Sequence, residues 1–390
     1  MTKRTPMPSQ NLNVRWINES IFDGVDCHFE MRTWQLTSSS FNSNNIYCEE
    51  RMTSVDGKTI AIMRSLSPVP GFVKQLWVCD LRTRKIALVS DRVTSGITSN
   101  IFSDDLYYIE KISPAQNVLM KLDMATLTTQ MVFDFEDHPI TGGCSISNDG
   151  RYYVSGPIHI KGAIFGLSCL DLEKGTSEIF HEQADICNPH LQFEPKNSDY
   201  LLVQQNRGCE FDSNGNVIRL VGDLGATVYA LDFKSGKRIS LPVGKPNTSP
   251  LTGHECWISN STDILITTVD VFTGHNKALG GNIYKVSLSK EEACPLARGL
   301  AFNHLSSSTD GRFFVADDFR SGHVFVGSIN TGKHYAVCDP QTRIGRPQYA
   351  HPHPYMTADN KYIIYNSVKS GLAQVYAAEI PDGLLETLED

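Results

Sequence analysis

The sequence predicts an all-β protein, a seven-bladed β-propeller, and three observations support this prediction. A strand-turn-strand pattern that pivots on an acidic or hydroxyl residue recurs seven times along the 390 residues. Each copy is preceded by a polar turn that leads into a second strand-like run. Helical periodicity is not sustained over any long stretch. Repeated four-stranded units of this kind are typical of propellers, whose blades surround a central channel.

The first repeated element is a strand-like run, a turn and another strand, as in LWVCDLRTRKIALV and GLSCLDLEKGTSEIF. The pivots are spaced about 40 to 60 residues apart, at Asp80, Asp123, Asp171, Asp232, Ser287, Ser328 and Glu379. The second element is a turn of Asp, Asn and Gly before a β-rich run, as in SNDGRYYVS and STDGRFFVAD. Such turns are typical of antiparallel hairpins. A solenoid is the alternative, but copies of irregular length favour a closed ring.

The two ends of the chain are predicted to meet in the last blade. The last copy stops at Glu379 to Pro381 and leaves too little chain for an outer strand. Residues 29–39, FEMRTWQLTSS, are expected to supply that strand and close the ring. The predicted organisation is therefore an N-terminal extension, residues 1–28, and a single propeller domain, residues 29–390.

Composition excludes several classes of partner. The net charge is −8 and no run is rich in Lys or Arg, so a nucleic-acid partner is not expected. No stretch of about 18 apolar residues is present to span a membrane, and the first residues lack the apolar core of a signal peptide. The 10 cysteines are scattered singly, which favours free thiols and a cytoplasmic location. The oligomeric state is left open.

Four histidines share one position in the repeat. His190 and His254 lie ten residues before the strand that follows the polar turn, and His304 and His353 lie nine before it. Arg51 occupies the corresponding place in the first unit. Equivalent positions converge on the axis of a ring, so these side chains are expected to form one compact site.

The stretch PQYAHPHPYM adds Gln348 and His351 to this position. Residues at i and i+2 point to the same side of a strand, so His351 and His353 can bind one object. Imidazole is the commonest metal ligand in proteins, although a stiff His-Pro-His-Pro turn is the alternative interpretation. The register-matched histidines favour a metal site near the axis. Hydrolase, zincin, P-loop and dinucleotide motifs are absent.

Three segments carry a resemblance to a known family: TGHECW, FNHLSSSTDGRFFVADD and QYAHPHPYMTADNKYIIYNSVKSGLAQVY. They resemble the oligogalacturonate lyases, polysaccharide lyase family 22, which are cytoplasmic seven-bladed propellers acting on short pectin fragments. The resemblance runs weakly from about residue 30 to the C-terminus and is sharp in the last three units. It implies that a manganese ion is held by a glutamine and three histidines, and that a further histidine is the general base. The matching residues are His304, Gln348, His351 and His353 for the metal and His254 for the base.

One region departs from the family pattern. The family has an H-E-G-P stretch and then a substrate-binding arginine, whose place here falls near Ala226 or Thr227. Galacturonate specificity is therefore left open, whereas the uronate class is retained. The residues expected to bind substrate are Arg51, Lys74, His190 and Arg207.

The expected activity is a metal-dependent β-elimination on short oligo-uronides. His254 would take the proton at C5, and a divalent cation would stabilise the charge that develops on the neighbouring carboxylate. The neutral nitrogen and oxygen ligands suit Mn²⁺ or another divalent transition metal. Two alternatives stay open: a non-catalytic TolB-like propeller that serves as an interaction module, and a metal-dependent hydrolase or epimerase on uronides.

Overall fold

The computed structural model describes ten segments of the chain, and the account below is confined to them. They are residues 9–26, 29–38, 40–67, 74–135, 141–212, 216–259, 261–269, 282–297, 299–342 and 347–390. Within them the secondary structure is almost entirely antiparallel strand, with two short helices, η1 (Gln348–Ala350) and α2 (Leu384–Glu389). The all-β prediction is confirmed.

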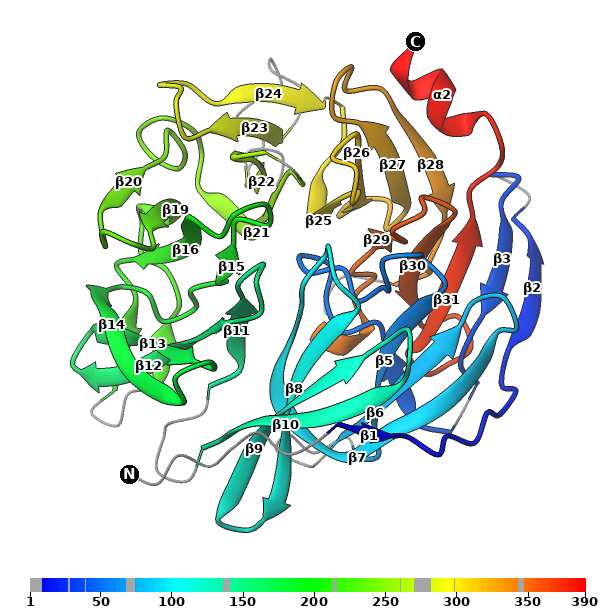
Figure 1. The fold of residues 1–390 in the computed structure, drawn as a ribbon. Coiled ribbons are helices and arrows are strands. Elements are labelled where there is room, and N and C mark those ends of the chain that lie inside the picture. Colours follow the sequence, from blue (N-terminus) through cyan, green and yellow to red (C-terminus); the bar gives the residue numbers. More distant parts are fainter. Residues whose placement is uncertain are drawn as a thin grey trace.

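The strands form sheets that follow one another around a central axis (Figure 1). One sheet has eight strands, β1 (Gln10–Asn11), β4 (Asn42–Asn44), β5 (Thr59–Ser65), β6 (Lys74–Asp80), β7 (Lys85–Ser99), β8 (Asp105–Ser113), β9 (Gln116–Asp123) and β10 (Thr128–Asp134). The next has four, β11 (Gly143–Ile146), β12 (Tyr152–Lys161), β13 (Ile164–Asp171) and β14 (Thr176–Ala184). Apart from β1, which pairs with β10 at the edge of the first sheet, both are meanders of sequential neighbours, which is the pattern that the repeats predict.

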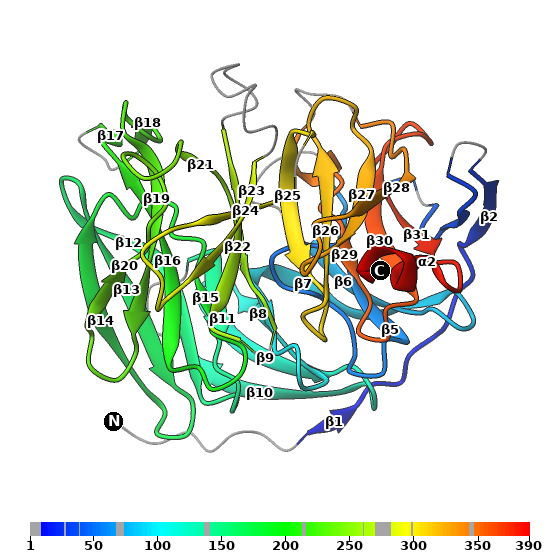
Figure 2. The same ribbon diagram turned by 90° about the horizontal axis from the view of Figure 1, so that it is seen from above.

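The second half of the chain continues the series. A further sheet contains β15 (Gln192–Phe193), β16 (Tyr200–Arg207), β19 (Gly225–Asp232), β20 (Arg238–Ser240), β21 (Leu251–Trp257), β22 (Asp263–Thr268), β23 (Ile283–Ser287) and β24 (Cys294–Ala297). A hairpin of β17 (Glu210–Phe211) and β18 (Val217–Arg219) projects from one face (Figure 2). A four-stranded sheet follows, with β25 (Phe302–Ser307), β26 (Phe313–Asp318), β27 (Val324–Ser328) and β28 (His334–Cys338).

The last sheet joins the two ends of the chain, as the sequence predicts. It comprises β2 (Ile21–Val25), β3 (Arg32–Gln35), β31 (Gln374–Glu379), β30 (Tyr362–Ser367) and β29 (Tyr355–Met356). β3 lies within the predicted segment and runs antiparallel to β31, with Thr33 opposite Ala378. The indole of Trp34 donates a hydrogen bond of 2.9 Å to Glu379. In Figure 1 the blue and red strands accordingly lie side by side.

The predicted boundary between an extension and the domain remains a prediction. β1 and β2 both precede residue 29, and both are paired, β1 with β10 and β2 with β3. The part of the chain before the boundary thus contributes strands to the sheets at two places.

The repeated polar positions stabilise turns. Asp80, at a pivot, accepts the backbone N–H of Arg82 at 2.9 Å, and Asp232 accepts that of Ser235 at 2.8 Å. In the second element a hydroxyl donates to the Asp two residues later, at 2.6 Å from Ser147. Asp and Ser are favoured in turns because their short side chains satisfy nearby backbone N–H groups.

Apolar side chains of neighbouring sheets pack into continuous clusters. The largest contains fully buried residues of β5 and β6, together with Leu36, which directly follows β3. Every cysteine in the described segments is a free thiol. Among those segments, none of the helices combines the length and the apolar character needed to cross a membrane.

Candidate active site

The register-matched histidines come together near the axis, where the innermost strands begin. The ring centroids of His254 and His304 lie 4.4 Å apart, and those of His304 and His353 also lie 4.4 Å apart. His190 is 6.3 Å from His254 by the same measure. These residues come from four successive units, so the convergence predicted from the repeat is present.

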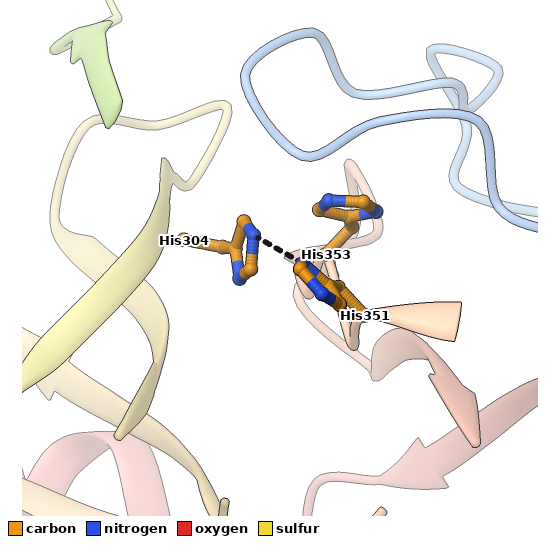
Figure 3. Close-up of side chains that lie close together, drawn as sticks. All are labelled: His304, His351 and His353. Carbon is orange, nitrogen blue, oxygen red and sulfur yellow. Dashed lines mark hydrogen bonds between the residues drawn. The ribbon is translucent and has the colours of Figure 1, made fainter. Parts of the chain in front are cut away.

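His304, His351 and His353 form a cluster with the geometry of a metal site. Their ligand-capable nitrogens all lie within 4.8 Å of one another. Figure 3 shows the three rings and the 3.3 Å contact between His351 Nδ1 and His304 Nε2. The side-chain amide of Gln348 lies 3.2 Å from His353 Nε2. An amide can present either its oxygen or its nitrogen by rotating half a turn, so the Gln348 oxygen can face the same space.

His254 and His304 both lie where the register of a strand pair shifts, as it does at a β-bulge. The register between β21 and β22 shifts between Leu251 and Glu255, and His254 lies in the shifted stretch. The register between β25 and β26 shifts in the same way between Phe302 and Leu305, around His304. A bulge re-aims the side chain of the extra residue. Gly253, next to His254, has a φ of +97°, a conformation that favours glycine.

His353 has a backbone conformation that the surrounding residues enforce. Its φ is +42°, and its register equivalent His190 has a φ of +44°. For residues other than glycine this costs about 1–3 kcal/mol, so neighbouring groups must hold it. The buried Asn45 side chain donates to the His353 carbonyl at 2.7 Å, and the Asn366 side chain donates to the His351 carbonyl at 2.9 Å.

Asp317 orients His304 and was not expected from the sequence. Its carboxylate lies 2.9 Å from His304 Nδ1 and accepts the backbone N–H of His304 at 2.7 Å. A carboxylate on one ring nitrogen fixes the tautomer and leaves the other nitrogen, Nε2, for a ligand. Burial, with the charges of His254 and His351, lowers the pKa of His304 well below its ordinary value. The ring is therefore neutral near pH 7, as a metal ligand must be.

His254 lies beside this cluster and contacts two residues of the first unit. Its Nδ1 is 3.3 Å from the Tyr47 hydroxyl and 3.6 Å from Glu49 Oε1. Sequence reasoning missed both residues. The available signal was their position, four and two residues before Arg51, which occupies the register of the histidines.

Comparison with known proteins places this arrangement in context. No family model matches the chain. The chain is 28% identical to an oligogalacturonate lyase of Dickeya dadantii over 158 residues, which cover 36% of each protein. It is 28% identical to an oligogalacturonide lyase of Pectobacterium atrosepticum over 101 residues, which cover 21% of this chain and 26% of the relative. The chain thus spans about a third of the length of the first relative.

Two solved structures are similar over nearly the whole chain. One is an oligogalacturonate lyase in complex with manganese, with a TM-score of 0.69 and 17% identity, covering 96% of this chain and 98% of that chain. The other is an oligogalacturonate lyase from Vibrio parahaemolyticus, with a TM-score of 0.63, 16% identity and the same coverage of 96% and 98%. The predicted resemblance to oligogalacturonate lyases is confirmed. These two likenesses show the fold.

The four predicted substrate-binding residues fall into two groups. Lys74 and His190 line a cavity of about 490 Å³, together with Tyr47 and Glu49. The cavity thus extends from His190 to Lys74 at the start of β6, so these two predicted residues line one space.

The two arginines bond to protein groups instead. The buried Arg51 guanidinium donates to the Ser307 carbonyl and, at 3.0 Å, to Ser259 Oγ. Arg207 donates to the carbonyls of Gly225, Leu224 and Lys245 at 3.1, 2.8 and 2.8 Å. Their predicted role in substrate binding stays a prediction, since the bonds shown are structural.

The place of the oligogalacturonate lyases' arginine is a buried strand position. Ala226 and Thr227 lie in β19, and Ala226 pairs with Asn206 of β16. The Thr227 hydroxyl donates to the Val243 carbonyl at 2.7 Å. Neither side chain carries a positive charge, so the departure noted in the sequence holds in the structure.

Proposed function

We propose that the protein is a metal-dependent lyase that cleaves short oligo-uronides, similar to oligogalacturonate, by β-elimination. The observation that carries this proposal is the three-histidine cluster with Gln348. The ring of His304 in this cluster lies next to that of His254, with 4.4 Å between their centroids. The likeness to oligogalacturonate lyases, one of which was solved with manganese, supports the same reaction.

The ligand set fits a divalent transition metal. His304, Gln348, His351 and His353 would hold the ion, and nitrogen donors mixed with one amide oxygen suit Mn²⁺ or a neighbouring metal. Nδ1 of His353 is buried and has no hydrogen-bond partner in the described residues, so this nitrogen is available to bind a metal ion. When bound, such an ion supplies a Lewis acid for the substrate carboxylate.

His254 is proposed as the general base. A neutral imidazole can take the C5 proton, after which the C5–H electron pair forms the C4–C5 double bond and the C4–O4 bond breaks. The ring is largely buried, with an exposed fraction of 9%, and its Nδ1 faces Tyr47 and Glu49. Proximity to His304 would place the base beside the carboxylate of the same sugar.

Lys74 and His190 are proposed to contact the substrate in the adjoining cavity. A uronide carries one carboxylate per sugar, and a lysine ammonium provides a charge-assisted hydrogen bond to such a group. Arg51 and Arg207 remain weaker proposals because protein acceptors engage both. A cytoplasmic location is proposed from the free thiols of the described segments.

The test is to incubate the metal-loaded protein with di- and trisaccharide uronides and follow ultraviolet absorbance. Elimination creates a double bond conjugated with the carboxylate, and the absorbance rises. A hydrolase would release reducing ends without that absorbance, and an epimerase would change neither. An interaction module of the TolB-like kind would leave the sugars intact. Absence of the absorbance change on all uronides would refute the lyase proposal.

We further propose that the strands form seven blades, the last closed by β3. Deleting residues 1–40 then removes β3 and the fully buried Leu36, and it exposes the edge of β31. Losing one such core side chain costs about 2–5 kcal/mol, so we expect the unfolding temperature to fall by on the order of 10 °C and the protein to aggregate. Thermal unfolding checks this. An unchanged unfolding temperature would count against closure by β3.

A further inference from the structure

The carboxylate of Glu49 lies between two of the register-matched histidines. Its two oxygens are 2.9 and 3.1 Å from His190 Nδ1, and Oε1 is 3.6 Å from His254 Nδ1. The side chain is only 6% exposed. The two histidines belong to neighbouring units, whereas Glu49 comes from the segment between β4 and β5. One carboxylate therefore faces the same nitrogen of both rings.

Glu49 is negatively charged in its site between His190 and His254. Burial by itself would raise its pKa, but the charge and hydrogen bond of His190, and then those of His254, lower it below the ordinary value. Conversely, burial opposes charge on His190, but Glu49 raises the pKa of His190 to about 9. The nearby Glu255 differs, because burial raises its pKa to about 8. Of these two glutamates, Glu49 is thus the one that carries a negative charge near pH 7.

The hydroxyl of Tyr47 cannot by itself decide the tautomer of His254. It is the nearer neighbour of Nδ1, at 3.3 Å, but a hydroxyl can either donate to that nitrogen or accept from it. A carboxylate can only accept. At 3.6 Å the Glu49 oxygen is beyond an ordinary hydrogen bond, so it acts through its charge at close range. The His190 ring that balances part of this charge lies farther from His254, with 6.3 Å between the ring centroids.

We propose that Glu49 is a positioning residue that keeps the proton of His254 on Nδ1 and so leaves Nε2 free to accept the C5 proton of the substrate. His190 fixes the carboxylate from the other side. The assignment rests on the proposed lyase function, and it adds a carboxylate-histidine arrangement to it, with Glu49 acting through His254. A wrong tautomer would leave the base in place but with a proton already on the reacting nitrogen.

Glu49→Gln tests the assignment, because glutamine keeps the size of the side chain and removes its charge. We expect kcat on an oligo-uronide to fall on the order of 10²-fold, with KM and bound metal unchanged. Glu49→Asp keeps the charge but moves it away from His254, because the aspartate side chain is one methylene shorter. We expect this variant to retain more activity than Glu49→Gln. Glu110→Gln is the matched control. That glutamate is also buried, pairs with Arg92 at 3.3 Å, and should keep native activity when replaced.

A second readout does not depend on activity. Nitrogen-15 NMR of the full chain loaded with diamagnetic Zn²⁺ reports which nitrogen of His254 is protonated, with His254→Asn identifying the signal. We expect the proton on Nδ1 in the native protein and a shift toward Nε2 in Glu49→Gln. A native protein with the proton on Nε2 would overturn the inference, even if Glu49→Gln does not fold.

The two readouts separate this inference from the lyase proposal. An inactive native protein whose His254 tautomer depends on Glu49 contradicts the lyase proposal and supports the positioning role. An active native protein whose kcat and tautomer are both unchanged in Glu49→Gln overturns the positioning role and leaves the lyase proposal standing.

Discussion

Replacing His254 by Asn is expected to lower the rate of elimination by a factor on the order of 10² to 10⁴, the usual contribution of a general base. Asparagine keeps polarity and approximate size, and it can still contact the Tyr47 hydroxyl, which lies 3.3 Å from His254 Nδ1. What it lacks is a nitrogen that can take a proton near pH 7. Initial rates of the ultraviolet absorbance change at saturating oligo-uronide measure the effect.

Metal content and binding of the sugar should be unaffected in this variant, because His254 is outside the three-histidine cluster. His159→Asn is a suitable control, since His159 contacts the Gly162 carbonyl at 2.8 Å in a surface hairpin. If His254→Asn turns over a confirmed substrate at the native rate, the base lies elsewhere. His190, the register equivalent one unit earlier, is then the next residue to replace.

The repeat made much of this site predictable. His254, His304 and His353 could be grouped from the sequence because equivalent positions of a ring meet near its axis, however far apart they are along the chain. The same logic placed residues 29–39 beside the last unit, where β3 pairs with β31. Both inferences depend on counting residues from the turns. The turns can be recognised in the sequence because Asp and Ser are favoured there, where their side chains satisfy specific backbone groups.

The residues that orient the histidines were not predictable in this way. Asp317 is on the strand adjacent to His304. The sequence of a strand does not indicate which residue of the neighbouring strand an acidic side chain will contact. Glu49 and Tyr47 contact His254 from a segment about 200 residues earlier in the chain, so no local spacing relates them. Arg51 shows that a position in the repeat does not by itself predict what the side chain contacts. Its position in the repeat groups it with the histidines, but its guanidinium bonds to Ser307 and Ser259.

The double replacement His351→Ala and His353→Ala is expected to abolish stoichiometric metal binding. The change removes two of the three imidazoles in the cluster and leaves only His304 and Gln348, which is too few ligands to hold a divalent ion against dialysis. Elemental analysis after loading with Mn²⁺ and exhaustive dialysis measures the loss. The native protein should retain close to one ion per chain.

His190→Ala provides the matched control, because His190 shares the register but bonds to Glu49 outside the cluster, and it should retain the metal. His353 has a φ of +42°, which asparagine tolerates better than alanine. A second double variant, His351→Ala with His353→Asn, therefore guards against misfolding. Unfolding temperatures close to that of the native apoprotein show that a loss of metal is local. Full metal retention in the double variant would exclude His351 and His353 as ligands, because the remaining pair could not bind the ion with native stoichiometry.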